Sequence, residues 1–454
     1  MILFWLVLLP IAGGLVFIVL RRWPIIVVPL AAATLLAMSI LAVSVSQTES
    51  AFFMGRLVEL RPLQAFVLAY CYLLATALIL AGYRLSYGTG VYPLTLFFMA
   101  IITACVAIQD ATLAALLLEA AVIIGILIIA TSAPDATFTS LRVLSVLVLL
   151  GPLLLIATWA LAGRSVDPND LSLVRLGGTS LVLATVIGFA VMPLGFWLPP
   201  VFRNGNPLAI LLLGFTLQVV LLSRLSGVFT LSLWPGGQQF LFSLLILGGL
   251  ITVIAAGVIA AFQTSISGIL AYTFIADMGI VMIGIGLGTD ALLRVAVLHL
   301  IYRGVAITGA STGLSVLRLS VGGDHLDQVK GAWQSSPLAV IGLLLAACSL
   351  VGMPLAAGFT TRLTIIGSLG ASRLPWAVAV IAASLGPAFA WGRFAFKAFS
   401  PGAGEYRHEP LIPALMALLL GLVLLAFGCY PRLIQLLPPE WLQALMSIVL
   451  PLVR

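Results

Sequence analysis

The chain has 454 residues, of which 62% are apolar and only 8% are charged, and its formal net charge is +7. This composition excludes a soluble globular domain and is typical of a polytopic helical membrane protein. The apolar runs are long and continuous, which excludes a barrel, and the positive charge is scattered over short loops, which excludes a nucleic-acid surface.

Apolar runs long enough to span a membrane follow one another along the whole chain. The run 1–20 is too long for a signal-peptide core and lacks a small-residue cleavage site, so we expect it to be retained as the first span. Several later runs are short or broken, so the sequence predicts about 14 transmembrane helices in a single domain over 1–454. The runs are 1–20, 24–46, 63–82, 92–109, 111–132, 140–162, 178–198, 207–226, 238–262, 267–287, 292–317, 337–353, 358–371, 375–396, 411–430 and 441–453.

The stretch 92–132 contains the most informative charge in the sequence. Only Asp110 and Glu119 carry charge there, and two spans meet at Asp110, so that residue is expected at a membrane surface. At 1.5 Å per residue, Glu119 lies about 13 Å deeper, close to the bilayer midplane, where a carboxylate is costly. Either Glu119 is protonated or paired with an Arg and joins two helices, or it carries protons or contacts ions inside the bundle.

Prolines interrupt the apolar runs in both halves of the chain. Pro199-Pro200 and Asn206-Pro207 lie between two runs, and Gly386-Pro387 lies in the middle of 375–396. Proline removes a helical hydrogen bond, and broken helices at corresponding positions are typical of inverted-repeat transporters. We therefore expect two inverted five-helix repeats, over 92–262 and 267–430, with a helix broken near Pro387. The alternative is that these prolines only shape loops and kinks.

The sequence carries no motif for a bound cofactor. The four cysteines are isolated in apolar runs, and we expect them to be small buried side chains. The three histidines are far apart, and no glycine-rich phosphate loop or paired-cysteine element is present. We therefore expect no nucleotide, flavin, iron–sulfur centre or other metal in this chain. The cysteines are Cys71, Cys105, Cys348 and Cys429.

Five short motifs occur in order over roughly residues 90–400. Together they resemble the antiporter-like membrane subunits of respiratory complex I (NADH:quinone oxidoreductase), shared with membrane-bound hydrogenases and Mrp-type cation/proton antiporters. The second motif lacks a histidine that the family has. The motifs are Asp110 nine residues before Glu119; Phe196-Trp197-Leu198-Pro199; Gln263 followed by Leu270-Ala271-Tyr272 and Asp277-Met278-Gly279; His299-Leu300; and Gly352-x-Pro354-x3-Gly358-Phe359-x2-Arg362.

The resemblance implies a relay of buried lysines that this chain does not contain. Its two lysines, Lys330 and Lys397, lie in or beside loops. The family's lysine positions correspond here to Gln218, Ser267 and Ile307. A buried Lys can change its charge, whereas Gln cannot, so the lysine relay is absent.

The polar residues that remain at depth are candidates for a rewired proton path. His299 and Arg303 are four residues apart and share a helix face, and Asp277 lies on the preceding predicted helix. The sequence predicts a buried Asp277–Arg303 ion pair with His299 beside it. This cluster is either a fixed electrostatic link or part of a path through Glu119, His299 and Asp277 with bridging waters. The full set of candidates is Glu119, Asp277, His299, Arg303, Gln218 and Arg362.

From this resemblance we expect an antiporter-like membrane subunit of a complex I-related, redox-driven proton-translocating assembly, with a degenerate proton path. Its expected partners are other membrane subunits, the lipid bilayer and protons or Na⁺, and its expected location is a bacterial inner membrane. Two alternatives stay open: a structural subunit of the same membrane arm that does not pump, and a free-standing secondary cation/proton antiporter. The chain itself is expected to be a non-catalytic subunit.

Overall fold

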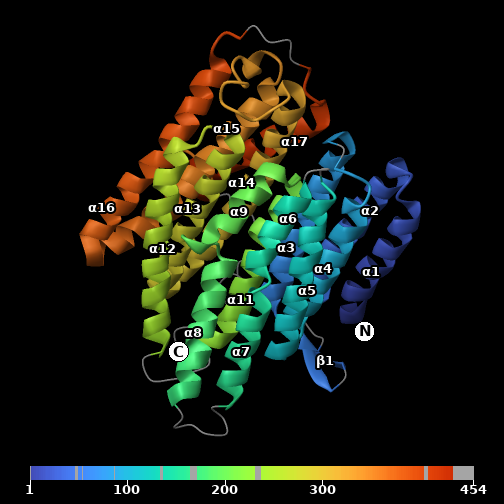
Figure 1. Ribbon diagram of the computed structural model, residues 1–454, viewed down its shortest axis with the longest axis vertical. Coiled ribbons are helices and arrows are strands. Elements are labelled where there is room, and N and C mark those ends of the chain that lie inside the picture. Colours follow the sequence, from blue (N-terminus) through green and yellow to red (C-terminus); the bar gives the residue numbers. More distant parts are fainter. Residues whose placement is uncertain are drawn as a thin grey trace. The chain divides into compact units, whose positions relative to one another are not determined.

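The computed structural model describes residues 2–45, 50–53, 55–85, 87–132, 136–163, 171–230, 237–402 and 407–432, and these are almost entirely helical (Figure 1). Helices satisfy all backbone hydrogen bonds within one segment, as a membrane interior requires. Eleven helices in the described residues are long and apolar enough to cross a membrane, and the shorter apolar helices cover 91–107, 175–188 and 337–351. The chain is an integral membrane protein, and the expected number of about 14 spans stays a prediction.

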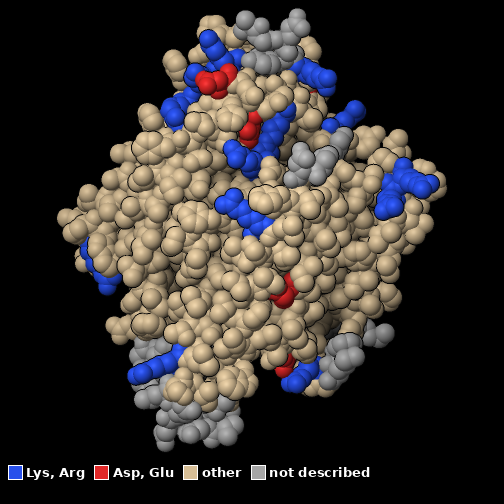
Figure 2. Space-filling model, in the orientation of Figure 1, with Lys and Arg blue, Asp and Glu red and all other residues tan. Residues whose placement is uncertain are grey.

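Most of the surface displayed in Figure 2 carries no charged side chain. Large apolar side chains are exposed along the helices, for example Val19 at 79% and Ile25 at 70% of their full accessible surface. Such side chains would be unfavourable in water, but they match the hydrocarbon of a bilayer. The outward-facing residues therefore agree with the spans expected from the sequence.

The chain divides into two compact units. The first comprises residues 1–83, 87–190 and 211–241, and the second comprises 84–86, 191–210 and 242–454. The inverted-repeat relation between 92–262 and 267–430 stays a prediction. The expected last span, 441–453, lies outside the described residues.

The first unit consists of apolar helices and one short hairpin. The hairpin lies in the segment 47–62, which was expected to be a loop, and pairs Ser50–Phe53 (β1) with Arg56–Glu59 (β2) in antiparallel register. Gly55 lies between the strands with φ +74°, a value that side chains disfavour and glycine permits. The helices are α1 (Ile2–Leu20), α2 (Pro24–Val45), α3 (Pro62–Leu85), α4 (Val91–Ala107), α5 (Ala111–Ala130), α6 (Ala136–Leu147), α7 (Leu150–Gly163), α8 (Leu171–Gly188) and α11 (Leu217–Thr230).

Two predicted spans of the first unit are shorter or less regular than expected. The span 140–162 is not continuous, because a turn at Val148–Leu149 separates α6 from α7. The span 178–198 ends ten residues early, because α8 stops at Gly188. The following span begins as expected at Pro207, where the Asn206 side chain accepts from the Ala209 N–H at 2.8 Å and caps the helix.

Residues 194–216 form several short helical pieces. Around Pro199-Pro200 and Pro207 the chain forms short helices and a π-helical segment, and Pro199 and Pro207 each lie in the first turn of a helix. The π-helical segment has one extra residue per turn, a geometry that often marks functional sites. The pieces are η1 (Leu194–Trp197), α9 (Leu198–Asn204), α10 (Pro207–Ala209) and η2 (Ile210–Thr216, the π-helix).

The second unit is built on helices that pack through small residues and a continuous apolar core. Gly249 of α12 and Gly279 of α13 each lie against the other's carbonyl oxygen, so the two helix backbones approach closely. Ile246, Ile280 and Ile365 belong to the buried core between these helices and α16. The helices are α12 (Gly237–Phe262), α13 (Ile266–Gly286), α14 (Asp290–Val321), η3 (Ala332–Gln334), α15 (Pro337–Val351), α16 (Ala357–Phe399) and α17 (Leu411–Cys429).

The prediction of a helix broken near Pro387 is wrong. Helix α16 continues through Pro387 and is interrupted 14 residues earlier, at Arg373 (φ −148°, ψ 66°), between the spans expected over 358–371 and 375–396. Pro387 leaves the Ala383 carbonyl without its helical donor, but that oxygen packs against Gly257 of α12. Gly386 in turn lies against the Gly257 carbonyl. The Gly386-Pro387 pair is therefore a site of close helix packing.

Candidate functional site

Glu119 lies near the middle of α5 and is partly buried inside the first unit. Its Oε2 atom accepts a hydrogen bond from the backbone N–H of Gly151 at 3.0 Å. Its other oxygen, Oε1, is buried without a hydrogen-bond partner. Within the described residues of its own unit, no Lys, Arg or His lies within ion-pair distance of Glu119. The interpretation that Glu119 is neutralised by an Arg is therefore not supported within this unit.

The turn between α6 and α7 supplies the Gly151 donor. Pro152 has no N–H, so it cannot bond the carbonyl of Val148, and its ring crowds that carbonyl. The helix restarts at Leu150, and the N–H of Gly151 in its first turn has no partner within the helix. A side chain at Gly151 would also collide with Glu119, because a Cβ there would lie 2.7 Å from Oε2. Gly151-Pro152 thus both frees a donor and leaves room for the carboxyl group.

This arrangement leaves the protonation of Glu119 adjustable. One oxygen accepts a backbone hydrogen bond and stays an acceptor in both charge states, while Oε1 is able to carry a proton or to bond a water molecule. A carboxyl group with one unpartnered oxygen is chemically able to take up and release a proton.

Gln218 is 1% exposed and lies at the start of α11, directly after the π-helical segment η2. Leu213 of η2 packs against Gly125 of α5, so the segment contacts the helix that carries Glu119. The amide of Gln218 cannot gain or lose a proton near neutral pH. Gln218 is thus buried and cannot change its charge.

Asp277 is the centre of a buried charge cluster in the second unit. Its Oδ2 accepts from Arg303 Nη1 at 2.9 Å, and its Oδ1 lies 2.8 Å from His299 Nε2. The side chains of Asp277 and Arg303 are each 1% exposed. The ion pair expected from the sequence is therefore present, with His299 beside it.

Arg303 is held by more than its carboxylate partner. The same Nη1 donates to the Phe274 carbonyl at 2.9 Å, one helical turn before Asp277 on α13. The guanidinium carbon lies 3.5 Å from the centroid of the Phe274 ring, a cation–π contact. These contacts fix Arg303 against α13 in a single orientation.

Arg362 adds a second guanidinium to the cluster from α16. Nη1 donates to the Leu350 carbonyl at 2.9 Å and lies 3.9 Å from Asp277 Oδ1, while Nη2 donates to Ser384 Oγ at 3.0 Å. Gly352 ends α15 with φ +78°, and a Cβ at this glycine would collide with Arg362 Cδ. The Gly352 of the fifth motif therefore leaves the space through which Arg362 reaches the cluster.

His299 bridges Asp277 and Thr361 of α16. Thr361 Oγ1 lies 2.7 Å from His299 Nδ1 and 3.1 Å from the Gly358 carbonyl, and its single hydrogen serves one of them. If Thr361 donates to Nδ1, His299 donates Nε2–H to Asp277; if Thr361 donates to the Gly358 carbonyl, both ring nitrogens of His299 donate. In both cases His299 Nε2 donates to Asp277, so the hydrogen-bonded bridge from α13 to α16 is kept.

The Asp277 cluster thus contains two guanidiniums, one carboxylate and the imidazole of His299. Arg stays protonated at any accessible pH, so the two guanidinium charges are permanent. Both carboxylate oxygens of Asp277 and both ring nitrogens of His299 have partners at short distance. The geometry favours the fixed electrostatic link over a proton-exchanging group, and the role of its members in proton movement stays a prediction.

Sequence reasoning missed Gly151, Thr361 and Ser384. The Gly151-Pro152 pair was present inside a predicted span, and it could have indicated the helix restart opposite Glu119. Thr361 directly precedes Arg362 in the fifth motif, whereas nothing in the sequence distinguishes Ser384. Of the four cysteines, Cys71 and Cys105 are buried as expected, but Cys429 at the end of α17 is exposed. Among the described residues, no group of three or more His, Cys, Asp and Glu side chains is placed to hold a metal ion.

Part of the chain is similar to proteins of a known family. Residues 168–386 match the family described as NADH:quinone oxidoreductase/Mrp antiporter, transmembrane region. NAD(P)H-quinone oxidoreductase subunit 2 of Picosynechococcus sp. (strain ATCC 27264 / PCC 7002 / PR-6) is 31% identical over 202 residues. This match covers 40% of the present chain and only 36% of that relative's length.

Three solved structures share the fold along nearly the full chain, at sequence identities that support the fold alone. A chain of the membrane-bound sulfane sulfur reductase, an archaeal respiratory membrane complex, aligns with a TM-score of 0.84 at 18% identity, covering 100% of this chain and 98% of that one. A chain of the Mrp complex from Dietzia sp. DQ12-45-1b gives 0.82 at 16% identity and 99% of both chains. Respiratory complex I from Thermus thermophilus with bound NADH gives 0.79 at 17% identity and 100% of both chains.

Proposed function

Because residues 168–386 carry the membrane domain of the NADH:quinone oxidoreductase and Mrp antiporter family, we propose that this antiporter-like membrane subunit works in a complex I-related, redox-driven proton-translocating assembly. We propose further that it lies in a bacterial inner membrane among other membrane subunits and that it handles protons. The observation that carries the proton-handling part is Glu119, a mid-helix carboxyl group with one backbone donor and one unpartnered oxygen.

The proton path in this proposal is degenerate. The first unit keeps an adjustable carboxyl group at Glu119, whereas the second unit has a fixed cluster at Asp277 in place of a switching lysine. A permanent positive charge repels a mobile proton, so the second unit contributes electrostatics and rigidity. Proton exchange is then confined to the first unit.

The fixed Asp277 cluster also favours the second candidate, a structural subunit of the same membrane arm that does not pump. In that case Glu119 stays permanently protonated or hydrated and only joins α5 to α7. The two candidates share their partners and differ in whether Glu119 exchanges protons. The third candidate, a free-standing antiporter, differs from both in its partners.

Purification under mild conditions tests the assembly part of the proposal. An affinity-tagged full-length chain, extracted in a mild detergent, is expected to co-migrate with several other membrane subunits and with quinone-reducing activity. Recovery of the chain alone, or with one partner and without redox activity, would contradict the proposal and support a secondary antiporter. The separate question of pumping is decided by proton translocation in sealed vesicles.

A further inference from the structure

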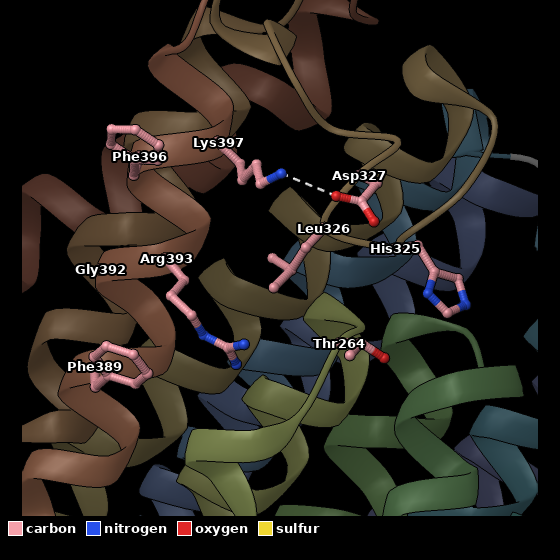
Figure 3. Close-up of a pocket in the computed structure, with 9 residues that line it drawn as sticks. All are labelled: Thr264, His325, Leu326, Asp327, Phe389, Gly392, Arg393, Phe396 and Lys397. Atoms are coloured by element: carbon pink, nitrogen blue, oxygen red, sulfur yellow. Dashed lines mark hydrogen bonds and ion pairs between the residues drawn. The ribbon is translucent and has the colours of Figure 1, made fainter.

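A cavity of about 500 Å³ opens beside the C-terminal end of α16, away from the Asp277 cluster. Figure 3 shows Arg393 and Lys397 extending from α16 toward the segments that carry Thr264, Leu326 and Asp327. Lys397 Nζ lies 2.9 Å from Asp327 Oδ1. The remaining lining residues are His325, Phe389, Gly392 and Phe396. Two cations and one carboxylate line the cavity, so its formal charge is +1 with His325 neutral.

The cavity lies at one end of an apolar stripe on α16. Exposed large apolar side chains recur along one face of the helix from Leu374 to Phe396, and Phe399 continues this face past Lys397 to the end of the helix. At 1.5 Å per residue the stripe is about 33 Å long, which matches the hydrocarbon thickness of a bilayer. The cavity is therefore at the level of the lipid headgroups. The stripe comprises Leu374, Val378, Ile381, Leu385, Phe389 and Phe396, each 52–74% exposed.

The charges in the cavity are arranged so that an anion can bind there with little loss of free energy. Arg393 Nη2 already donates to the carbonyls of Ala261 and Gln263, at 2.7 and 2.6 Å, which holds its guanidinium at the end of α12. The Lys397–Asp327 pair is exposed, with 40% and 90% of the two side chains accessible. Exposed ion pairs of this kind contribute little to the stability of the fold. Lys397 can therefore replace the Asp327 carboxylate by a phosphate with almost no loss of free energy.

We propose that this cavity binds the phosphate headgroup of an anionic phospholipid, whose acyl chains lie along the stripe of α16. The cations supply the charge complementarity, and Phe389 and Phe396 supply the apolar contact below it. The proposal depends on the chain spanning a membrane and is independent of whether the chain moves protons.

Gly392 offers a direct way to close the cavity. A Cβ at Gly392 would meet no atom within 4 Å, so Gly392→Phe fills the cavity without a backbone collision. Gly367 lies on the same helix with equally open space and is not part of the cavity, so Gly367→Phe is the matched control. Lys397→Gln removes a cation, and Asp327→Asn removes the competing carboxylate.

The test uses the full chain with its co-purifying subunits in phosphatidylcholine nanodiscs, with a trace of photoactivatable phosphatidylglycerol. Peptide mapping should place the label on α16 between Arg373 and Phe399. Lys397→Gln should lower the labelling about fivefold, because this is the factor in affinity that one cation contributes at an anionic membrane surface. Gly392→Phe should reduce it to the level of photoactivatable phosphatidylcholine, Gly367→Phe should leave it unchanged, and Asp327→Asn should raise it.

Four results would each overturn the proposal. They are equal labelling by the two lipids, an unchanged signal in Gly392→Phe, loss of labelling upon addition of excess inorganic phosphate, and crosslinks from a photoreactive residue at Phe396 to a protein neighbour in place of lipid. The third result would identify a free-phosphate site, and the fourth would identify a subunit interface.

Discussion

Glu119 and Asp277 are both carboxylates in membrane-spanning helices, yet their surroundings are opposite. Glu119 has one backbone donor and an unpartnered oxygen, and among the described residues of its unit no cation lies within ion-pair distance. Asp277 has two short side-chain partners and a second guanidinium 3.9 Å away. The number and kind of partners, and not burial alone, decide whether a carboxylate in a membrane can exchange a proton. We therefore propose that Glu119 is a titratable group and that Asp277 is an electrostatic anchor.

The largest expected effect follows from removing the Asp277 carboxylate. Asp277→Ala leaves Arg303 and Arg362 buried without their carboxylate, and the loss of stability is expected to be about 3–5 kcal/mol. The readout is the amount of assembled complex and its thermal midpoint after extraction.

The double variant Asp277→Ala with Arg303→Leu supplies the control. It removes the stranded charge together with its partner, so much of the assembly should return. Equal losses in the single and double variants would show that the two residues do not stabilise the fold as a pair.

A smaller effect is expected at the donor to Glu119. Gly151→Ala places a Cβ against Glu119 Oε2 and should cost about 1–3 kcal/mol by overpacking, measured as thermal stability of the purified protein. In a Glu119→Ala background the same substitution should cost much less, because the colliding side chain is gone. If Gly151→Ala lowered the thermal stability by the same amount in both backgrounds, Gly151 and Glu119 would not be in direct contact. Gly367→Ala, in open space on α16, is the neutral control.

The smallest effect concerns a carboxylate outside the spans. Burial acts to raise the pKa of Asp324, but Arg318 at 2.8 Å, Ser267 and His325 together hold that pKa below its ordinary value. A lowered pKa means that Asp324 stabilises the fold above the pKa of the unfolded chain, and that this contribution is lost as pH falls through the folded pKa. Asp324→Asn should therefore cost about 1 kcal/mol at neutral pH, with the difference disappearing below about pH 4.

Thermal unfolding of the two proteins across this pH range measures the Asp324 effect. Asp327→Asn serves as the comparison, since its exposed pair with Lys397 should give no resolvable change at any pH. A constant difference between wild type and Asp324→Asn down to strong acid would show that the Asp324 charge does not stabilise the fold.

The sequence predicted the features that depend on local pattern. The position of Glu119 in the middle of a helix followed from the length of an apolar run, and the Asp277–Arg303 pair followed from helical spacing and motif order. The break near Pro387 was wrong, because the effect of a proline depends on what packs against the carbonyl it frees, here Gly257 of a helix distant in sequence. The donor from Gly151 was missed for the same reason: a break inside a continuous apolar run becomes visible only through its tertiary partner.

The most direct test of the account is proton translocation by Glu119→Gln in sealed vesicles, measured as protons moved per electron pair. Gln keeps the volume and can still accept from the Gly151 N–H, but it has no ionisable proton. We predict normal assembly, with the same subunits in the same amounts, and a lower proton-to-electron ratio. Normal assembly with an unchanged ratio would contradict the account and would leave Glu119 as a structural link between α5 and α7.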